Sequence, residues 1–172
     1  QRWQNVYPGP VDFDDQVHSN ESGLYVQDEI AVSDRLALNL GLRHDHYETF
    51  GASTNPRAAI ILFPADQTTL KLLYGSAFRA PTVYELYYGS HANPDLRPES
   101  IATYEIVLEQ YARGNLRLSG SAYLYRISDL VSVNTSSGLF ENLDHVSAQG
   151  LEIEMEKRFR SGFRLRGSSS LQ

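Results

Sequence analysis

Cysteine is absent from the 172-residue sequence, which excludes disulfide bridges, thiolate metal sites and a cysteine nucleophile. Long apolar runs are also absent, so no segment approaches the roughly 20 residues that a transmembrane helix requires. Basic residues are outnumbered, 15 against 21 acidic ones, and there is no basic stripe of the kind that a nucleic-acid-binding protein carries. A membrane β-barrel stays possible, because barrel strands alternate polar and apolar residues and keep the mean hydropathy low.

Apolar residues recur with a period of two, as in a β-strand that has one apolar and one polar face. In the segment 35–47, for example, Leu36 and Leu38 share one parity, while Asn39 and Arg43 share the other. No segment shows helical periodicity. The sequence therefore predicts an all-β fold of about eight antiparallel strands. We expect them at 23–32, 35–47, 56–64, 68–78, 100–112, 115–125, 150–158 and 162–172.

The connections between these strands alternate in length. Short turns are expected near 33–35, 64–67, 112–114 and 160–162. Long loops are expected at 1–21, 48–55, 79–99 and 129–145. Because alternate connections of an up-and-down meander lie at the same end, this order places tight turns at one end and long loops at the other. Such asymmetry is typical of outer-membrane barrels, whereas a Greek-key sandwich gives no reason for it.

Two motifs lie in and around the loop 79–99. The run YGSAFRAPTVYELYY is followed by NPDLRPES and then by YEI. This order resembles the signature of TonB-dependent outer-membrane receptors, in which Phe-Arg-Ala-Pro and Asn-Pro-(Asn/Asp)-Leu-x-Pro-Glu bracket one loop. The segments YVQDEIAVSDRLALNLGLRHD, NPRAAIILF and ENLDHVSAQGLEIEME are similar to barrel strands of the same family. The resemblance covers nearly the whole chain from about residue 22.

The resemblance implies a barrel of about 22 strands with an N-terminal plug domain, opened by an energy-coupling protein of the inner membrane. At roughly 9–11 residues per strand, 172 residues are too few for that barrel. We therefore expect a partial transmembrane β-barrel over residues 1–172, with a loop at 1–21, strands and loops at 22–172, and no plug domain.

The resemblance also implies a function, namely uptake of a ferric siderophore, haem or a similar scarce nutrient across the bacterial outer membrane. The expected partners are outer-membrane lipid, the small-molecule cargo and, through the plug of a full receptor, the TonB coupling protein. Nucleic acid is not expected as a partner. No Ser/His/Asp set, phosphate-binding glycine loop or isolated carboxylate pair stands out, so we expect no enzyme and no covalently bound cofactor.

The loop between the two motifs contains the candidate ligand-binding residues. They are Arg79, Tyr84, Tyr87, Tyr88, His91 and Asn93. In haem-uptake members of the family a histidine between these motifs is taken as a haem ligand, so the resemblance implies that role for His91, with an exposed polar loop residue as the alternative. Arg79 pairs either with an anionic ligand or with Glu85 or Glu99.

Charged residues on the polar parity of the strands are expected to line the lumen of a full barrel. They are Arg43, Asp45, Glu105, Glu109, Arg117, Glu152 and Glu154. In a soluble protein the same residues would form a solvated face. His44 and His46 share one face of a strand and are weak candidates for a divalent metal site, because polar residues are expected there anyway, beyond the membrane edge.

Two other architectures fit the strand pattern. One is a self-contained outer-membrane barrel of eight strands, which would require the first strand to pair with the last. The other is a soluble antiparallel β domain that acts as a binding module. Pairing of 23–32 with 162–172 would favour the small barrel, and stability in water without detergent would favour the soluble domain.

Overall fold

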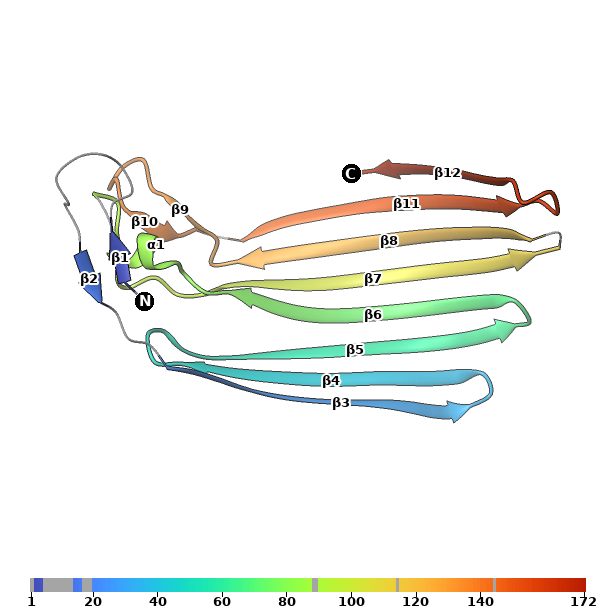
Figure 1. Ribbon diagram of the computed structural model, residues 1–172, viewed down its shortest axis with the longest axis horizontal. Coiled ribbons are helices and arrows are strands. Elements are labelled where there is room, and N and C mark those ends of the chain that lie inside the picture. The colour runs from blue at the N-terminus through green and yellow to red at the C-terminus, as the bar shows by residue number, and fades with distance from the viewer. Residues whose placement is uncertain (1, 5–13, 17–19, 88–89, 114, 144) are drawn as a thin grey trace.

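The computed structural model describes residues 2–4, 14–16, 20–87, 90–113, 115–143 and 145–172. Eight long strands form one antiparallel sheet, and they lie side by side in the order in which they follow one another along the chain (Figure 1). They are β3 (Glu21–Ser33), β4 (Leu36–Tyr47), β5 (Gly51–Ala65), β6 (Thr68–Arg79), β7 (Glu99–Ala112), β8 (Leu116–Ser128), β11 (Val146–Arg158) and β12 (Arg164–Leu171). The predicted antiparallel meander is confirmed.

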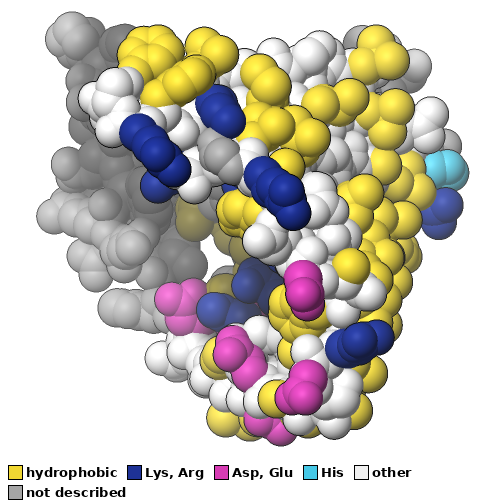
Figure 2. Space-filling model, turned by 90° about the vertical axis from the view of Figure 1, so that its right-hand side faces the viewer, with side chains coloured by type: hydrophobic (Ala, Val, Ile, Leu, Met, Phe, Trp, Pro, Cys, Tyr) yellow, Lys and Arg dark blue, Asp and Glu magenta, His cyan; other side chains and the backbone are white. Residues whose placement is uncertain are grey.

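The sheet is open, with β3 at one end of the strand order and β12 at the other. The first and last strands therefore do not pair with each other, whereas in a closed barrel of eight strands they would. The sheet still curves strongly: seen end-on in Figure 2, it bends around a hollow, and hydrophobic side chains follow its outer side. Such a curved, open sheet is what a section of a larger barrel looks like.

The register separates the two faces as the sequence predicts. Residues directly opposite each other in paired strands lie on the same face, so Leu38, Ile60 and Leu72 form one row on the outer face. The outer face also carries Leu36, Leu40, Leu116, Leu118 and Leu124, and the opposite face carries Arg43, Arg117, Glu105 and Glu152.

Apolar side chains face outward instead of forming a core. Among the described residues only Leu86, Leu96 and Tyr123 are buried hydrophobic residues, whereas Leu24 is 75% and Ile153 is 66% exposed. A soluble domain of this length would bury such side chains to gain the hydrophobic free energy. Their exposure fits a sheet whose outer face contacts the hydrocarbon of a membrane.

The connection between β4 and β5 differs from the prediction. A long loop was expected at 48–55, but β5 begins at Gly51, so only three residues, 48–50, lie between the strands. The ladder continues through pairs such as His44 with Thr54 and Asp45 with Ser53. The segment 51–55, Gly-Ala-Ser-Thr-Asn, has only small or polar residues on both parities because it extends past the apolar band, so the sequence shows no alternation there. The strict alternation of short and long connections is therefore wrong at this position.

The remaining elements are short and lie at the loop end of the sheet, on the left in Figure 1. Strands β1 (Arg2–Gln4) and β2 (Asp14–Gln16) pair with each other, as do β9 (Val131–Val133) and β10 (Phe140–Asn142). Helix α1 (Val83–Tyr87) has five residues, too few for periodicity to reveal. Within the described parts of the chain, no helix has the length and hydropathy needed to cross a membrane.

Tyr123 joins three strands on the inner face of the sheet. Its ring stacks on Tyr125 with 4.7 Å between centroids, and its hydroxyl accepts a hydrogen bond of 2.7 Å from Nε2 of Gln172. The same hydroxyl lies over Gly150 of β11: a Cβ atom added there would come within 2.5 Å of it and within 2.7 Å of the Leu171 carbonyl oxygen. Only glycine fits between this ring and the backbone of β12.

We expect Gly150→Ala to destabilise the barrel by about 1–3 kcal/mol, because the added methyl group forces Tyr123 away from its packed position. Heat-modifiable migration of the full-length receptor on electrophoresis in sodium dodecyl sulfate measures the folded fraction. Gly167→Ala is the matched control, since a Cβ atom at this position of β12 meets nothing within 4 Å. Equal behaviour of the two variants would contradict the prediction.

Candidate functional site

Two long connections lie together at the loop end of the sheet, one between β6 and β7 and one between β8 and β11 (Figure 1). The first contains α1, whose start is fixed by a capping box: the Glu85 carboxylate accepts hydrogen bonds from the Thr82 backbone N–H at 2.7 Å and from the Thr82 hydroxyl at 2.9 Å. In return, the backbone N–H of Glu85 donates to the Thr82 hydroxyl oxygen at 3.3 Å. Below, the paired loops are residues 80–87 and 90–98 together with residues 129–143.

Arg79 holds the base of the first loop. Its guanidinium donates to both oxygens of Glu99, each at 2.7 Å, and to both oxygens of Glu85, at 3.0 and 3.1 Å. An arginine has five N–H donors, so most of its capacity is used inside the protein. Of the two roles considered for Arg79, the structure shows pairing with carboxylates, and it shows pairing with both of them.

Glu85 and Glu99 both have a lowered pKa because of their contacts with Arg79. The hydrogen bonds from Arg79 lower the pKa of Glu99, with a further contribution from the backbone N–H of Val131. For Glu85, burial raises the pKa, but the hydrogen bonds from Arg79 and Thr82 outweigh burial and the net pKa is lowered. Both groups therefore stay ionised well into the acidic range, and the cluster combines one positive charge with two negative charges.

Backbone and amide hydrogen bonds tie the paired loops to each other. The Asn142 side chain accepts from the backbone N–H of Arg97 at 2.8 Å and donates to the carbonyls of Arg97 at 2.9 Å and Asp129 at 2.7 Å. The Asn93 side chain donates to the Phe140 carbonyl at 2.8 Å, and the Phe140 N–H donates to the His91 carbonyl at 2.7 Å. These bonds make the paired loops one structural unit.

An aromatic patch lies on this unit, formed by Tyr84, His91 and Phe140. The Phe140 ring makes edge-on contacts with Tyr84, at 6.1 Å between centroids, and with His91, at 6.3 Å. Tyr84 is 57% exposed, and His91 and Tyr87 are also exposed. Of the residues predicted from the sequence, the structure thus brings together Tyr84, His91 and Asn93, while Tyr88 lies outside the described residues.

His91 has one ring nitrogen engaged. Its Nδ1 lies in hydrogen-bond contact with the carbonyl oxygen of Gly138, and a carbonyl can only accept, so Nδ1 carries the proton. In the neutral ring Nε2 then has the free lone pair. A ring oriented by a carbonyl through one nitrogen is the usual arrangement for a histidine that ligates a metal through the other.

Charged side chains cross the inner face near the short turns as a ladder of alternating sign. Lys71 pairs with Glu109 at 3.1 Å, Arg117 pairs with Glu109 at 2.7 Å and with Glu154 at 2.8 Å, and Arg166 also contacts Glu154. Nearer the loops, Arg43 donates two hydrogen bonds to Asp45, at 2.7 and 2.8 Å, and Asp45 is only 3% exposed. Glu105 and Glu152 share this face by register.

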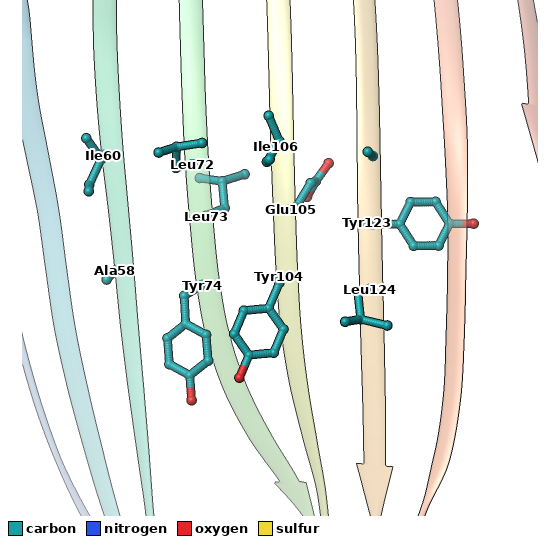
Figure 3. A pocket seen from close by; sticks show the side chains of 11 residues that line it. Ala58, Ile60, Leu72, Leu73, Tyr74, Tyr104, Glu105, Ile106, Tyr123 and Leu124 are labelled. Atoms are coloured by element: carbon teal, nitrogen blue, oxygen red, sulfur yellow. The ribbon is translucent and has the colours of Figure 1, made fainter.

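Among the described residues, the outer face carries no ion pair like those of the inner face's ladder, and its polar contacts are few, such as the Thr68 hydroxyl with the Gln110 side chain at 2.6 Å. A shallow hollow of about 500 Å³ on this face is bordered by two rows of apolar and aromatic side chains, among them Tyr74 and Tyr104, whose rings are 5.1 Å apart (Figure 3). His44 lies on the same face and its Nδ1 is 2.8 Å from the Thr54 hydroxyl. Among the described residues there is no group of three or more His, Cys, Asp or Glu side chains that could hold a metal ion, and this holds for the surroundings of His44 and His46 as well.

The match to known proteins decides the family. The family model described as "TonB dependent receptor-like, beta-barrel" matches residues 1–171. The chain belongs to this family. The resemblance inferred from the two loop motifs is therefore confirmed. Membership of this family argues against the alternative of a soluble antiparallel β domain that acts as a binding module.

Known members of the TonB-dependent receptor family are similar to this chain in sequence or in structure. The vitamin B12 transporter BtuB of Vibrio cholerae is 28% identical over 120 residues, which cover 69% of this chain and 20% of the transporter. A ferric enterobactin receptor of Pseudomonas aeruginosa, PfeA, superimposes with a TM-score of 0.80 at 20% identity, over 90% of this chain and 27% of that receptor. The siderophore receptor PirA of Acinetobacter baumannii gives 0.72 at 21% identity, over 83% and 26%.

The chain spans about a fifth of the length of the curated relatives that it matches. These relatives are named as transporters and receptors, and none of the three as an enzyme. At 18–21% identity the structural likeness shows the barrel fold of the receptor family and leaves the cargo open.

Loss of the Arg79 side chain should loosen the paired loops. In Arg79→Ala, Glu85 and Glu99 face each other without a cation, and we expect the unit to lose about 1–2 kcal/mol of stability. Spin labels at Ser90→Cys and Ser136→Cys in the two loops would report a broader distance distribution. Arg97→Ala is the control, because it removes only an exposed pair with Asp129 and should change little.

The paired loops should also respond to acid. Carboxylates with a lowered pKa stabilise the folded state above their ordinary value of 4.5, and this stabilisation is lost as the pH falls through the lowered values. With the same two labels, we expect a constant distance from neutral pH down to about 4.5 and a broader distribution below it. A distribution that broadens between pH 7 and 5 would contradict the role given to Glu85 and Glu99.

Proposed function

We propose that this chain is part of an outer-membrane receptor that captures a ferric siderophore, or a similar scarce nutrient, on its paired loops. The observation that carries this proposal is the cross-loop bonding by Asn142, Asn93 and Phe140, which fixes one surface and exposes the aromatic patch on it. A surface that is already ordered loses little conformational entropy when a ligand binds. Aromatic side chains supply contact area with few rotatable bonds.

The faces of the sheet support the proposed location. The outer face exposes many large apolar side chains, which suits contact with outer-membrane lipid, and the inner face carries the charge ladder. The paired loops would then lie on the cell exterior, and the short turns on the periplasmic side. Energy coupling to TonB would act through parts of a full receptor other than the strands described here.

Haem is a second candidate cargo, favoured by the geometry of His91. With Nδ1 held at the Gly138 carbonyl, Nε2 is the nitrogen able to bind iron, and Tyr84 and Phe140 offer aromatic surface nearby. A corrinoid is a third candidate only through the similarity to vitamin B12 transporters, and no contact in the paired loops favours it over an iron complex.

The test of loop capture uses the full-length receptor in cells that depend on it for iron. We expect Phe140→Ala to weaken binding of the cargo by about three- to tenfold, because the patch loses its central ring. Phe163→Ala is the matched control: this ring also contacts a second aromatic residue, Phe159, but at the short-turn end of the sheet. Equal effects of the two variants on uptake would argue against capture by the paired loops.

A variant of His91 distinguishes haem from a siderophore as the cargo. If the cargo is haem, we expect His91→Ala to abolish haem-dependent growth and to remove the absorption signature of bound haem, while His44→Ala has no effect. If the cargo is a siderophore, His91→Ala should cost no more than the loss of one ring contact. Normal haem binding in His91→Ala would refute the haem candidate and leave the siderophore candidate in place.

A further inference from the structure

The short turn between β11 and β12 is strongly basic. Residues 156–164, below called the basic hairpin, contain four cations and one carboxylate in a chain whose formal charge is -6. They are Lys157, Arg158, Arg160 and Arg164, with Glu156 as the carboxylate. By contrast, the turns between β3 and β4 and between β5 and β6 each carry an aspartate, Asp34 and Asp66. Figure 2 looks onto this end of the sheet, and basic side chains gather in its upper part beside hydrophobic ones.

Two of the four cations share the only carboxylate of the hairpin. Glu156 lies on the inner face and is only 8% exposed; it accepts a hydrogen bond of 2.7 Å from Nε of Arg158 and also contacts Arg164. Among the described residues, no carboxylate lies within 4.0 Å of Lys157 or Arg160. The basic hairpin therefore has an excess of positive charge that is open to an anion from outside the chain.

Lys157 lies on the outer face, in line with the apolar side chains of β11. Met155 precedes it on the same parity, and the register places it between Leu116 of β8 and Leu165 of β12. Its Nζ lies 5.9 Å from the centroid of the Phe159 ring, within the range of a cation–π interaction, and this ring is 43% exposed. At this hairpin the apolar outer face thus ends in a cation and an exposed aromatic ring.

Backbone hydrogen bonds order the tip of the hairpin. The N–H of Phe159 donates to the carbonyl of Phe163 at 2.8 Å, and the N–H of Gly162 donates to the carbonyl of Phe159 at 3.1 Å. Gly162 has a φ of 86°, a left-handed conformation that favours glycine, so the chain reverses within residues 160–162. Arg160 is exposed and therefore belongs to an ordered turn just beyond the end of the apolar face.

This combination of charge and apolar surface favours an amphiphilic anion. A soluble anion would contact only the cations, whereas the aliphatic strip and the Phe159 ring lie directly beside them. An extended polyanion would meet the carboxylates of Asp34 and Asp66 at the neighbouring turns. A lipid with an anionic headgroup matches both parts, because its phosphate can reach the cations while its acyl chains lie along the apolar strands.

We propose that the basic hairpin binds the headgroup of an anionic glycerophospholipid in the outer-membrane leaflet that faces the periplasm. Lys157 and Arg160 donate charge-assisted hydrogen bonds to the phosphodiester, and the Phe159 ring lies at the level of the ester groups. The acyl chains cover Met155 and Leu165 on the outer face. This site rests on the proposed function for its orientation in the membrane, with the short turns on the periplasmic side.

The test measures lipid binding to the full-length receptor by native mass spectrometry, with phosphatidylglycerol and phosphatidylethanolamine of the same acyl chains at equal concentration. We expect the wild type to bind phosphatidylglycerol preferentially. The double variant Lys157→Gln/Arg160→Gln should bind it at least about tenfold more weakly, because each cation near the headgroup adds to the affinity. Arg35→Gln/Arg113→Gln is the matched control: it removes two exposed arginines from other short turns at the same end and changes the net charge equally, so binding should be unchanged.

Heat-modifiable migration shows whether each variant is folded. Should the double variant not fold, Arg160→Gln alone is compared with Arg35→Gln, and we expect about threefold weaker binding in the first and none in the second. Unchanged phosphatidylglycerol binding in the hairpin variant, or an equal loss in the control, would overturn the site. A wild type that binds both lipids equally would overturn it too, as would displacement of phosphatidylglycerol by an equal concentration of glycerol phosphate, which identifies a soluble anion as the ligand.

These outcomes are independent of cargo capture. A receptor that binds phosphatidylglycerol at the basic hairpin but takes up no iron complex and no similar nutrient would overturn the proposed function and leave the lipid site in place. A receptor that captures its cargo but shows no lipid preference would overturn the lipid site and leave the proposed function intact.

Discussion

Each strand from β4 to β11 in the long sheet has to stay in register with two neighbours, because its backbone N–H and C=O groups have no other partners in a hydrocarbon environment. A shift of one residue would move a row of leucines such as Leu38 and Leu40 to the inner face and Arg43 to the outer one. The exposed apolar surface, the inner charge ladder and the position of every loop depend on this register. The junction of Tyr123 with Gly150 and Gln172 adds a side-chain constraint that favours the same alignment of β8, β11 and β12.

The charged residues of the inner face fall into groups that differ in how their charges are paired within the chain. In the ladder from Lys71 to Arg166 every charge has a partner of opposite sign, with three cations and two carboxylates, and the Arg79 cluster has one more carboxylate than it has cations. Both arrangements use their hydrogen-bonding capacity within the chain and give mechanical order to the strands and loops. Arg57 has no carboxylate partner among the described residues, so it belongs to neither arrangement.

The sequence predicts the strands well where they cross the apolar band, because alternation there has to satisfy two different environments. The prediction fails at residues 51–55, where β5 leaves the band and both faces carry only small or polar residues. Helix α1 is one turn long and was detectable only through the capping pair of Thr82 and Glu85. The position of Arg57 could not be predicted either, because the segment 56–64 is apolar on both parities and gives no assignment of faces.

The loop site was only partly predictable, and for a different reason. The two family motifs indicated the first loop and its residues Tyr84, His91 and Asn93, but Phe140 and Asn142 come from a second loop about 50 residues later in the chain. Contacts between distant loops follow from the three-dimensional path of both and leave no local pattern in the sequence. Arg79 had two possible partners in the sequence, and only the geometry showed that it binds Glu85 and Glu99 together.

The bonds that join the paired loops have an evolutionary consequence. Several of them use backbone atoms, such as the Phe140 N–H with the His91 carbonyl and the Arg97 N–H with Asn142, so they are indifferent to the side chains of Phe140, His91 and Arg97. Mutations can therefore exchange the outward side chains of the loops while the scaffold that presents them persists.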